Sequence, residues 1–474
     1  MLNATIEIKR RLTLEHQLNA PHHSRGIVSA LGFTVVILAV LTLLAGLPSS
    51  DQLVNFLIGV VVLIGVLLGV GLLGWHLLLR PLPANLQVTP QSLVGSTARS
   101  LVALLLTLGT LSIGIAGVWD EIWHSKYGIP FGKDFFWRPH LMLYFSFLTL
   151  IGVGIWSWWI LMTRGKGTLQ QRFRSSPILG VSFLAGLFTI YAVGADPIWH
   201  RLYGSDIAPW SLPHLMILVM ILFMGILTIA YHKSLMEPRE WGLKFQMNWR
   251  NVLIALVLVG GILDYMLIFT IQWYAAVSSE KQLTQILRYP DWLLAVFLTF
   301  LATLFGIIAL RATRQVGMAT LVGIIAFALR FLLDNGLGGV RVGTTPLLII
   351  VPLMLSLDLW YAIVLSRTQK PPAFWTTAIV VAVVFGVVGL PVLAANFPHP
   401  PVTAATIPGM IIASLLTALA SVWFGQLLGD MNNADNKTTI AQSAGSANWV
   451  TTVGLYAAYA VLLLVFVVTA VPPA

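Results

Sequence analysis

Two short segments of the chain carry the same residues with metal-binding chemistry. The first is DEIWHSKYG, from Asp120 to Gly128, and the second is DPIWHRLYG, from Asp196 to Gly204. Each is followed, after a gap, by the letters PHLM. The candidate ligands are therefore one carboxylate and two imidazoles in each copy: Asp120, His124 and His140, and Asp196, His200 and His214.

The spacing of these residues favours a shared cation. An Asp and a His four residues apart project from one face of a helix, and a hairpin would bring the second His back beside them. Two nitrogens and one oxygen suit iron, copper, zinc or nickel and leave positions open for water, oxygen or substrate. The alternative is an Asp–His pair that only forms hydrogen bonds. We favour a metal in at least one copy, because both copies keep the three polar positions while the loops between them differ.

The residues between the candidate ligands could form the walls of such a site. Trp and Tyr stand at matching places in the two copies and could pack against the ligands or donate hydrogen bonds to them. Glu121 has no counterpart, because Pro197 occupies its place. The residues that we expect to support the ligands are Glu121, Trp123, Tyr127, Trp199 and Tyr203.

The chain contains no cysteine. This excludes disulfides, iron–sulfur ligation, thiolate metal sites and covalent c-type haem attachment. A metal site would therefore depend on the imidazoles and carboxylates alone.

At these motifs the sequence resembles the C subunit of the particulate methane and ammonia monooxygenases, which are membrane copper enzymes. Thirteen residues separate His200 from His214, and fifteen separate His124 from His140. The resemblance covers a few dozen residues and implies a copper site on neighbouring transmembrane helices, together with partner subunits. The family subunit carries the motif once, whereas this chain carries it twice. The letters WDEIWH, with PHL following, also resemble uncharacterised bacterial multi-spanning proteins, which imply no function.

The elements that must position these residues are predicted to be transmembrane helices. The sequence is 58% hydrophobic and 9% charged, and apolar runs of about 20 residues, long enough to cross a bilayer, recur about thirteen times. We therefore predict an all-α polytopic helix bundle. The predicted spans are 27–48, 53–80, 97–122, 139–162, 177–198, 212–232, 251–275, 291–311, 317–334, 345–366, 374–395, 407–428 and 449–471.

The basic residues predict the orientation of the bundle. The net charge of +10 is dispersed among short loops, which argues against a nucleic-acid partner. Lys and Arg concentrate in alternate connections, as they do on the cytoplasmic side of polytopic proteins. We therefore expect a bacterial inner-membrane protein with a cytoplasmic N-terminal segment, 1–26, a C-terminus outside, and the motifs near the outer face.

The two motifs belong to a tandem repeat. His124 and His200 lie 76 residues apart, and His140 and His214 lie 74 apart. Each unit, at about 97–162 and 177–232, reads as helix, outer loop and helix, so the copies share one orientation. They would be related by an axis along the membrane normal or would pack side by side. We divide the membrane region into a half with the repeats, 27–250, and a second half, 251–474.

Four further charged residues fall inside predicted spans: Asp264, Arg330, Asp334 and Asp358. A charge inside a membrane is costly unless it is paired or hydrated. We expect an ion pair between helices, with Arg330 bound to Asp358, and favour it over a proton or ion path. His76 and His232 are expected at the membrane interface.

The leading functional hypothesis is a membrane metalloprotein, with copper, or alternatively iron or zinc, at one or both sites. It would be an oxidoreductase acting on a small apolar or lipid-like substrate. The alternatives are a non-catalytic integral subunit of a larger respiratory or photosynthetic complex, a b-type haem protein and a transporter. The expected partners are the lipid bilayer and either other membrane subunits or further copies of the chain.

Overall fold

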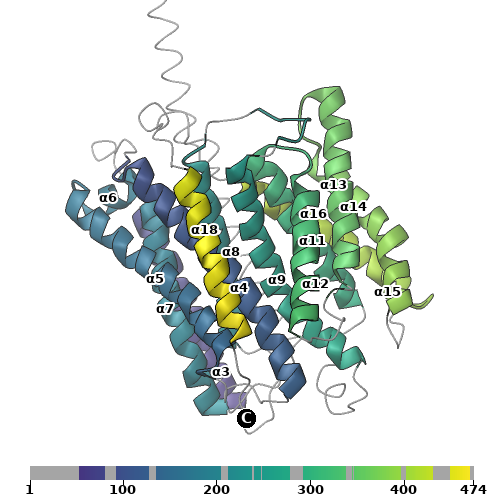
Figure 1. Ribbon diagram of the computed structural model, residues 1–474, viewed down its shortest axis with the longest axis horizontal. Coiled ribbons are helices and arrows are strands. Elements are labelled where there is room, and N and C mark those ends of the chain that lie inside the picture. The colour runs from purple at the N-terminus through teal and green to yellow at the C-terminus, as the bar shows by residue number, and fades with distance from the viewer. Residues whose placement is uncertain are drawn as a thin grey trace, which may run out of the picture.

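The computed structural model is a bundle of long helices (Figure 1). It describes residues 53–80, 92–127, 135–203, 212–236, 240–246, 248–277, 292–337, 344, 346–396, 402–430 and 449–469. These residues form no strand, apart from one isolated bridge between Gly242 and Gln315. The predicted all-α fold is confirmed. The predicted segment 1–26 and span 27–48 lie outside the described residues.

The first half of the chain supplies the helices of the repeat (Figure 1, purple to blue). The helix α4 runs to Tyr127, five residues beyond the predicted span, so that the D-x-x-x-H motif is helical. The helices are α3 Leu53–Gly74, continued by a π-helical turn Trp75–Leu79, α4 Ser96–Tyr127, α5 Arg138–Arg164, α6 Leu169–Ser175, α7 Pro177–Tyr203 and α8 Leu212–Lys233.

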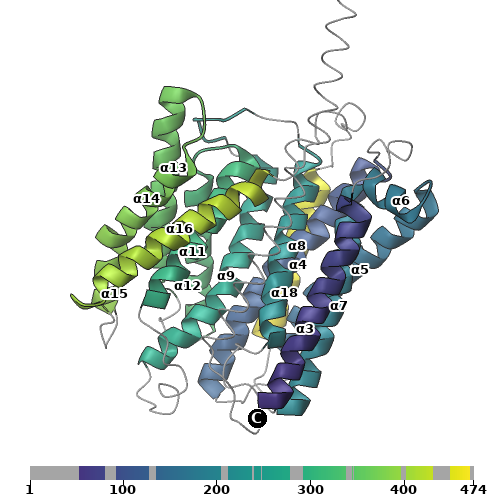
Figure 2. The ribbon, with the colours of Figure 1, turned by 180° about the vertical axis from the view of Figure 1, so that it is seen from behind.

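The helices α9 to α16 of the second half lie beside the first half (Figure 1, green), whereas α18 (yellow) lies among the helices of the first half. Figure 2 shows α16 lying obliquely across α11, against which it packs. The helix α18 packs against α4. The elements are α9 Trp249–Val277, α11 Trp292–Thr313, α12 Met318–Gly336, α13 Leu347–Thr368, α14 Phe374–Val384, a π-helical segment Phe385–Gly389, α15 Leu390–Asn396, α16 Ile407–Asp430 and α18 Trp449–Val468.

Ten helices within the described ranges are long and apolar enough to cross a membrane. Such a helix needs about 20 apolar residues to span the hydrocarbon layer. The segments α14, Phe385–Gly389 and α15 together make one of these spans, Phe374–Asn396. The chain is therefore a multi-pass membrane protein.

The four repeat helices form a closed ring. The helix α4 packs against α5, and α7 packs against α8. The second helix of each unit also packs against the first helix of the other unit, α5 against α7 and α8 against α4. A ring with these pairings fits two equivalent hairpins related by an axis along the bundle, whereas a row of helices would separate α8 from α4.

Glycine contacts hold the ring together and join it to the second half. A Cβ atom on Gly114 of α4 would lie 2.8 Å from the Cα of Gly260 on α9, and one on Gly154 of α5 would lie 2.9 Å from the Cα of Gly186 on α7. Small residues let membrane helices approach this closely, so that the backbones pack directly. The helix α4 is thereby fixed to both halves of the molecule.

Candidate metal centre

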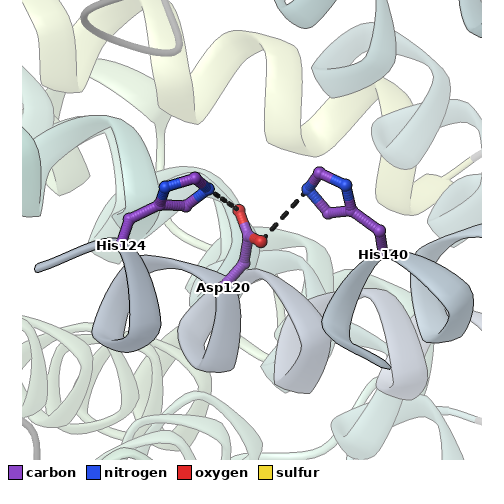
Figure 3. A group of neighbouring side chains, drawn as sticks. All are labelled: Asp120, His124 and His140. Atoms are coloured by element: carbon purple, nitrogen blue, oxygen red, sulfur yellow. Dashed lines mark ion pairs between the residues drawn. The ribbon is translucent and has the colours of Figure 1, made fainter. Parts of the chain in front are cut away.

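The first motif brings its three candidate ligands together (Figure 3). Asp120 and His124 lie one turn apart on α4, and His140 lies in the first turn of α5. The Asp120 carboxylate stands between the two rings, with Oδ1 3.1 Å from Nε2 of His140 and Oδ2 3.7 Å from Nε2 of His124. One ligand atom from each residue lies within 4.8 Å of the others.

The local sequence explains this geometry. The first turn of α5 contains Pro139, and proline is favoured there because the first N–H groups of a helix need no partner within it. The preceding residue, Trp137, at the N-cap of α5 has extended backbone angles. The helix α5 therefore begins two residues before His140, and its first turn places His140 beside the end of α4.

An aromatic wall encloses the ligands. The ring of Trp137 lies 4.7 Å from that of His124 and 5.8 Å from that of His140, measured between ring centroids. Trp123 packs edge-on against Trp137 at 5.4 Å, and Tyr127 packs against Trp123 at 5.9 Å. Trp123 and Tyr127 therefore lie beside the candidate ligands and contact them through Trp137, and their support of a metal stays a prediction.

Sequence reasoning missed three aromatic residues of this wall: Trp119, Trp137 and Tyr144. Trp119 packs against Trp123 at 5.2 Å, and Tyr144 lies 6.2 Å from His140. Trp137 stands three residues before His140, which is a local signal. The comparison of the two copies could not find it, because Ser211 stands at the equivalent place in the second copy.

The donor atoms are placed where one cation could bind all three. The side chains of Asp120 and His124 are 8% and 6% exposed, and Asp120 faces both rings, with Oδ1 3.1 Å from Nε2 of His140. The separation of 3.7 Å between His124 and Asp120 is too long for a hydrogen bond. A buried carboxylate is costly unless its oxygens are satisfied, and a cation between the three groups would satisfy them.

Glu121 points away from the ligands and binds the second half of the chain. Its Oε2 lies 2.9 Å from Nη1 of Arg330 on α12, and Nε of Arg330 lies 2.9 Å from Oδ1 of Asp334. The three side chains are at most 2% exposed. Glu121 was expected to support the metal ligands; it forms a buried ion pair between helices directly beside them, and its support of a metal stays a prediction.

Asp358 does not form the ion pair with Arg330 that the sequence led us to expect. It accepts hydrogen bonds from the backbone N–H of Gly317 at 2.7 Å and from the N–H and hydroxyl of Thr320 at 2.6 Å each. These groups lie at the start of α12, where a carboxylate caps free N–H groups and interacts favourably with the helix dipole. Arg330 is twelve residues further along α12, about 18 Å away at 1.5 Å per residue.

The second motif is only partly assembled in the described residues. Asp196 Oδ1 lies 3.8 Å from His214 Nε2, and the two side chains are 26% and 25% exposed. Trp199 is half-buried and packs against the core. The side chains of His200 and Tyr203 lie outside the described residues, so a second Asp–His–His site stays a prediction.

Two other polar residues lie deep in the bundle. Asp264 is buried on α9 and interacts electrostatically with His214 of the second motif. His232 was expected at the membrane interface, but it is 1% exposed and its Nε2 lies 2.8 Å from the hydroxyl of Thr107. The α4–α8 contact buries it. His76 is exposed, and its backbone carbonyl accepts a hydrogen bond from Gln170.

An apolar groove of about 670 Å³ lies on another part of the molecule, along α14, α15 and α16. Its lining includes Ile379, Val387 and Leu415 and contains none of the candidate ligands. The candidate centre is therefore separate from this groove.

The fold and the first motif together define an all-helical, multi-pass membrane protein with an Asp–His–His group that could hold a metal. No protein-family model, curated protein or solved structure matches the chain. The resemblance to the monooxygenase C subunit therefore stays a prediction from the motif.

Proposed function

We propose that the chain is a membrane metalloprotein that binds a divalent cation through Asp120, His124 and His140. One observation carries this proposal: two imidazoles and a carboxylate, from two helices of an apolar bundle, bring ligand atoms within 4.8 Å of one another in a mostly buried site. Intramembrane ionisable residues are rare and most often functional.

The carboxylate at the centre of the site favours a cation. Asp120 lies between the two histidine rings, whereas Arg330 is bound to Glu121 and Asp334. A buried carboxylate without compensating charge is strongly unfavourable in a medium of low polarity. A cation held by Asp120, His124 and His140 would supply that charge.

The donor set also bears on which metal is held. Two imidazoles and one carboxylate, with further positions open, are typical of redox-active iron and also suit copper and zinc. We favour copper because of the motif's resemblance, with iron or zinc as alternatives. A redox-active metal bound here would supply electron transfer and oxygen activation. Trp123 and Trp137 would restrict water beside the ligands, and a small apolar or lipid-like substrate would enter from the bilayer.

The geometry argues against b-type haem at this site. A haem with two axial histidines needs the porphyrin plane between the imidazoles. Here the Asp120 carboxylate occupies the space between the rings of His124 and His140 (Figure 3). The site is therefore better suited to a single ion.

The proposed orientation follows from the basic loops. Lys and Arg in alternate connections would place the ends of α5 and α8 that carry Arg164 and Lys233 in the cytoplasm of a bacterial cell. The first turn of α5, which carries His140, would then lie near the outer face of the inner membrane.

Metal analysis of the full-length protein tests the proposal. After purification in mild detergent without chelator, we expect about one equivalent of metal, with an electron paramagnetic resonance signal if it is Cu²⁺. The variants His124→Ala and His140→Ala should lose most of that metal while remaining helical, and the control His76→Ala should retain it. Less than about a tenth of an equivalent in the unmodified protein, even after incubation with Cu²⁺, Fe²⁺ or Zn²⁺, would contradict the proposal.

A further inference from the structure

The first motif, unlike the second, is joined to the second half of the chain by an ion pair of Glu121, which we call the tie. Glu121, the residue after Asp120, pairs with Arg330 of α12. Pro197 stands at the matching place in the second motif, where no such pair can form. The tied copy has the shorter distance from Asp to the second His, 3.1 Å against 3.8 Å, and the more buried carboxylate.

The positions of Asp120 and Glu121 on α4 explain how the tie could act. Successive residues of a helix project about 100° apart, since one turn takes 3.6 residues. Asp120 faces His140 on α5, and Glu121 faces α12. The two contacts therefore hold the end of α4 from two directions and resist its rotation, which would swing Asp120 and His124 away from His140.

Arg330 is itself held rigidly. Its Nε is bound to Asp334, one turn further along α12, and its Nη1 is bound to Glu121, so a planar guanidinium bridges two carboxylates at fixed angles. Arg330 is also fully buried, at 0% exposed. The carboxylate of Glu121 thus binds a guanidinium group that a second carboxylate holds in place.

We propose that Arg330 is a positioning residue of the metal centre. It acts through Glu121 to fix the end of α4, and so fixes the direction in which Asp120 and His124 point. This inference rests on the proposed function. It makes the second half of the chain a determinant of the metal's coordination geometry. Residues that orient the metal ligands without binding the metal typically change metal affinity by about 10- to 100-fold when they are removed.

Glu121→Ala is the sharpest test, because it cuts the tie and leaves Arg330 paired with Asp334, with no new unpaired charge. We expect Cu²⁺ affinity of the full-length protein in detergent to fall about 10- to 100-fold, and the copper hyperfine splitting to change. Glu121→Gln still accepts a hydrogen bond from Arg330 and should restore affinity to within about threefold with the original spectrum. Arg330→Lys, which keeps the charge but loses the planar fork, should fall between them.

The matched control is Asp430→Ala, which breaks another ion pair between helices, Arg311 of α11 with Asp430 at 2.9 Å. It should change neither the affinity nor the spectrum. A spectrum and affinity of Glu121→Ala equal to those of the unmodified protein would overturn the positioning role while leaving the metal centre intact. An unmodified protein that binds none of Cu²⁺, Fe²⁺ and Zn²⁺ would overturn both proposals. If it binds Fe²⁺ or Zn²⁺ in place of Cu²⁺, the same comparison of affinities is made with that metal. Circular dichroism and gel filtration of each variant show whether a loss of metal binding comes from misfolding of the chain.

Discussion

The two copies of the motif share their letters but not their surroundings. In the first copy, α4 packs against α5 and α8 and also against α9 and α12 of the second half. In the second copy, α7 packs mainly against α5 and α8. The first Asp and its second His are closer and more buried than their counterparts. Both copies supply candidate ligands, and the closer convergence in the first copy accompanies the contacts of its α4 with α9 and α12.

Removal of each Asp carboxylate should give the largest difference in Cu²⁺ affinity between the two copies. Asp120→Ala takes one ligand from a compact site, and we expect Cu²⁺ affinity to fall about 100-fold or more. Asp196→Ala removes the matching residue of the looser copy and should lower the affinity of the tightest site by less than about threefold. Isothermal titration of both variants gives the ratio. Equal losses would show that the two copies are equivalent.

An exchange at the glycine contact should have the next largest effect. Ile190 of α7 stands 76 residues after Gly114 and is half exposed. Gly114→Ile forces a side chain into the backbone of Gly260, and we expect a loss of about 3 kcal/mol or more. Ile190→Gly should cost about 1 kcal/mol through helix propensity and lost side-chain packing. Thermal unfolding in detergent measures both, and a stable Gly114→Ile variant would contradict the close α4–α9 contact.

Trp137→Ser copies the second motif into the first, since Ser211 is the equivalent residue. The change removes a large buried ring, and we expect a loss of about 3 kcal/mol in stability. Water would also reach His124 and His140, so that a chelator should remove bound Cu²⁺ several times faster. Stopped-flow chelation measures this rate against Trp199→Ser as the control. An unchanged rate would show that the aromatic wall does not protect the site.

The smallest effect is expected at the residue that replaces Glu121. Pro197 lies inside α7 and removes one helical hydrogen bond. Pro197→Ala should raise stability by about 1 kcal/mol at most, because it restores that bond but creates no contact with the second half. The Cu²⁺ content should stay the same. A second equivalent of copper in this variant would show that the proline itself keeps the second site open.

Much of the fold follows from local properties of the sequence. The apolar runs predicted the helices, the four-residue spacing placed Asp120 and His124 on one face, and Pro139 marked the start of α5. The pairing of charged residues on distant helices could not be predicted from the sequence, because it depends on which helices become neighbours and on the depth of each residue in the bundle. Arg330 therefore binds Glu121 rather than Asp358. The burial of His232 depends on tertiary packing in the same way, whereas Trp137 was missed because the second copy has Ser211 at its place.

The direct backbone contact between Gly114 and Gly260 has a consequence for how the two repeat units can diverge. A helix that touches its neighbour through bare backbone has almost no room for a side chain at that point, whereas Ile190 of α7 is half exposed, so we expect other apolar residues to fit there. A saturation-mutagenesis library would therefore show a narrow tolerance profile along α4 and a broad one along α7. The unit with the narrower profile is the one whose divergence helix packing limits most.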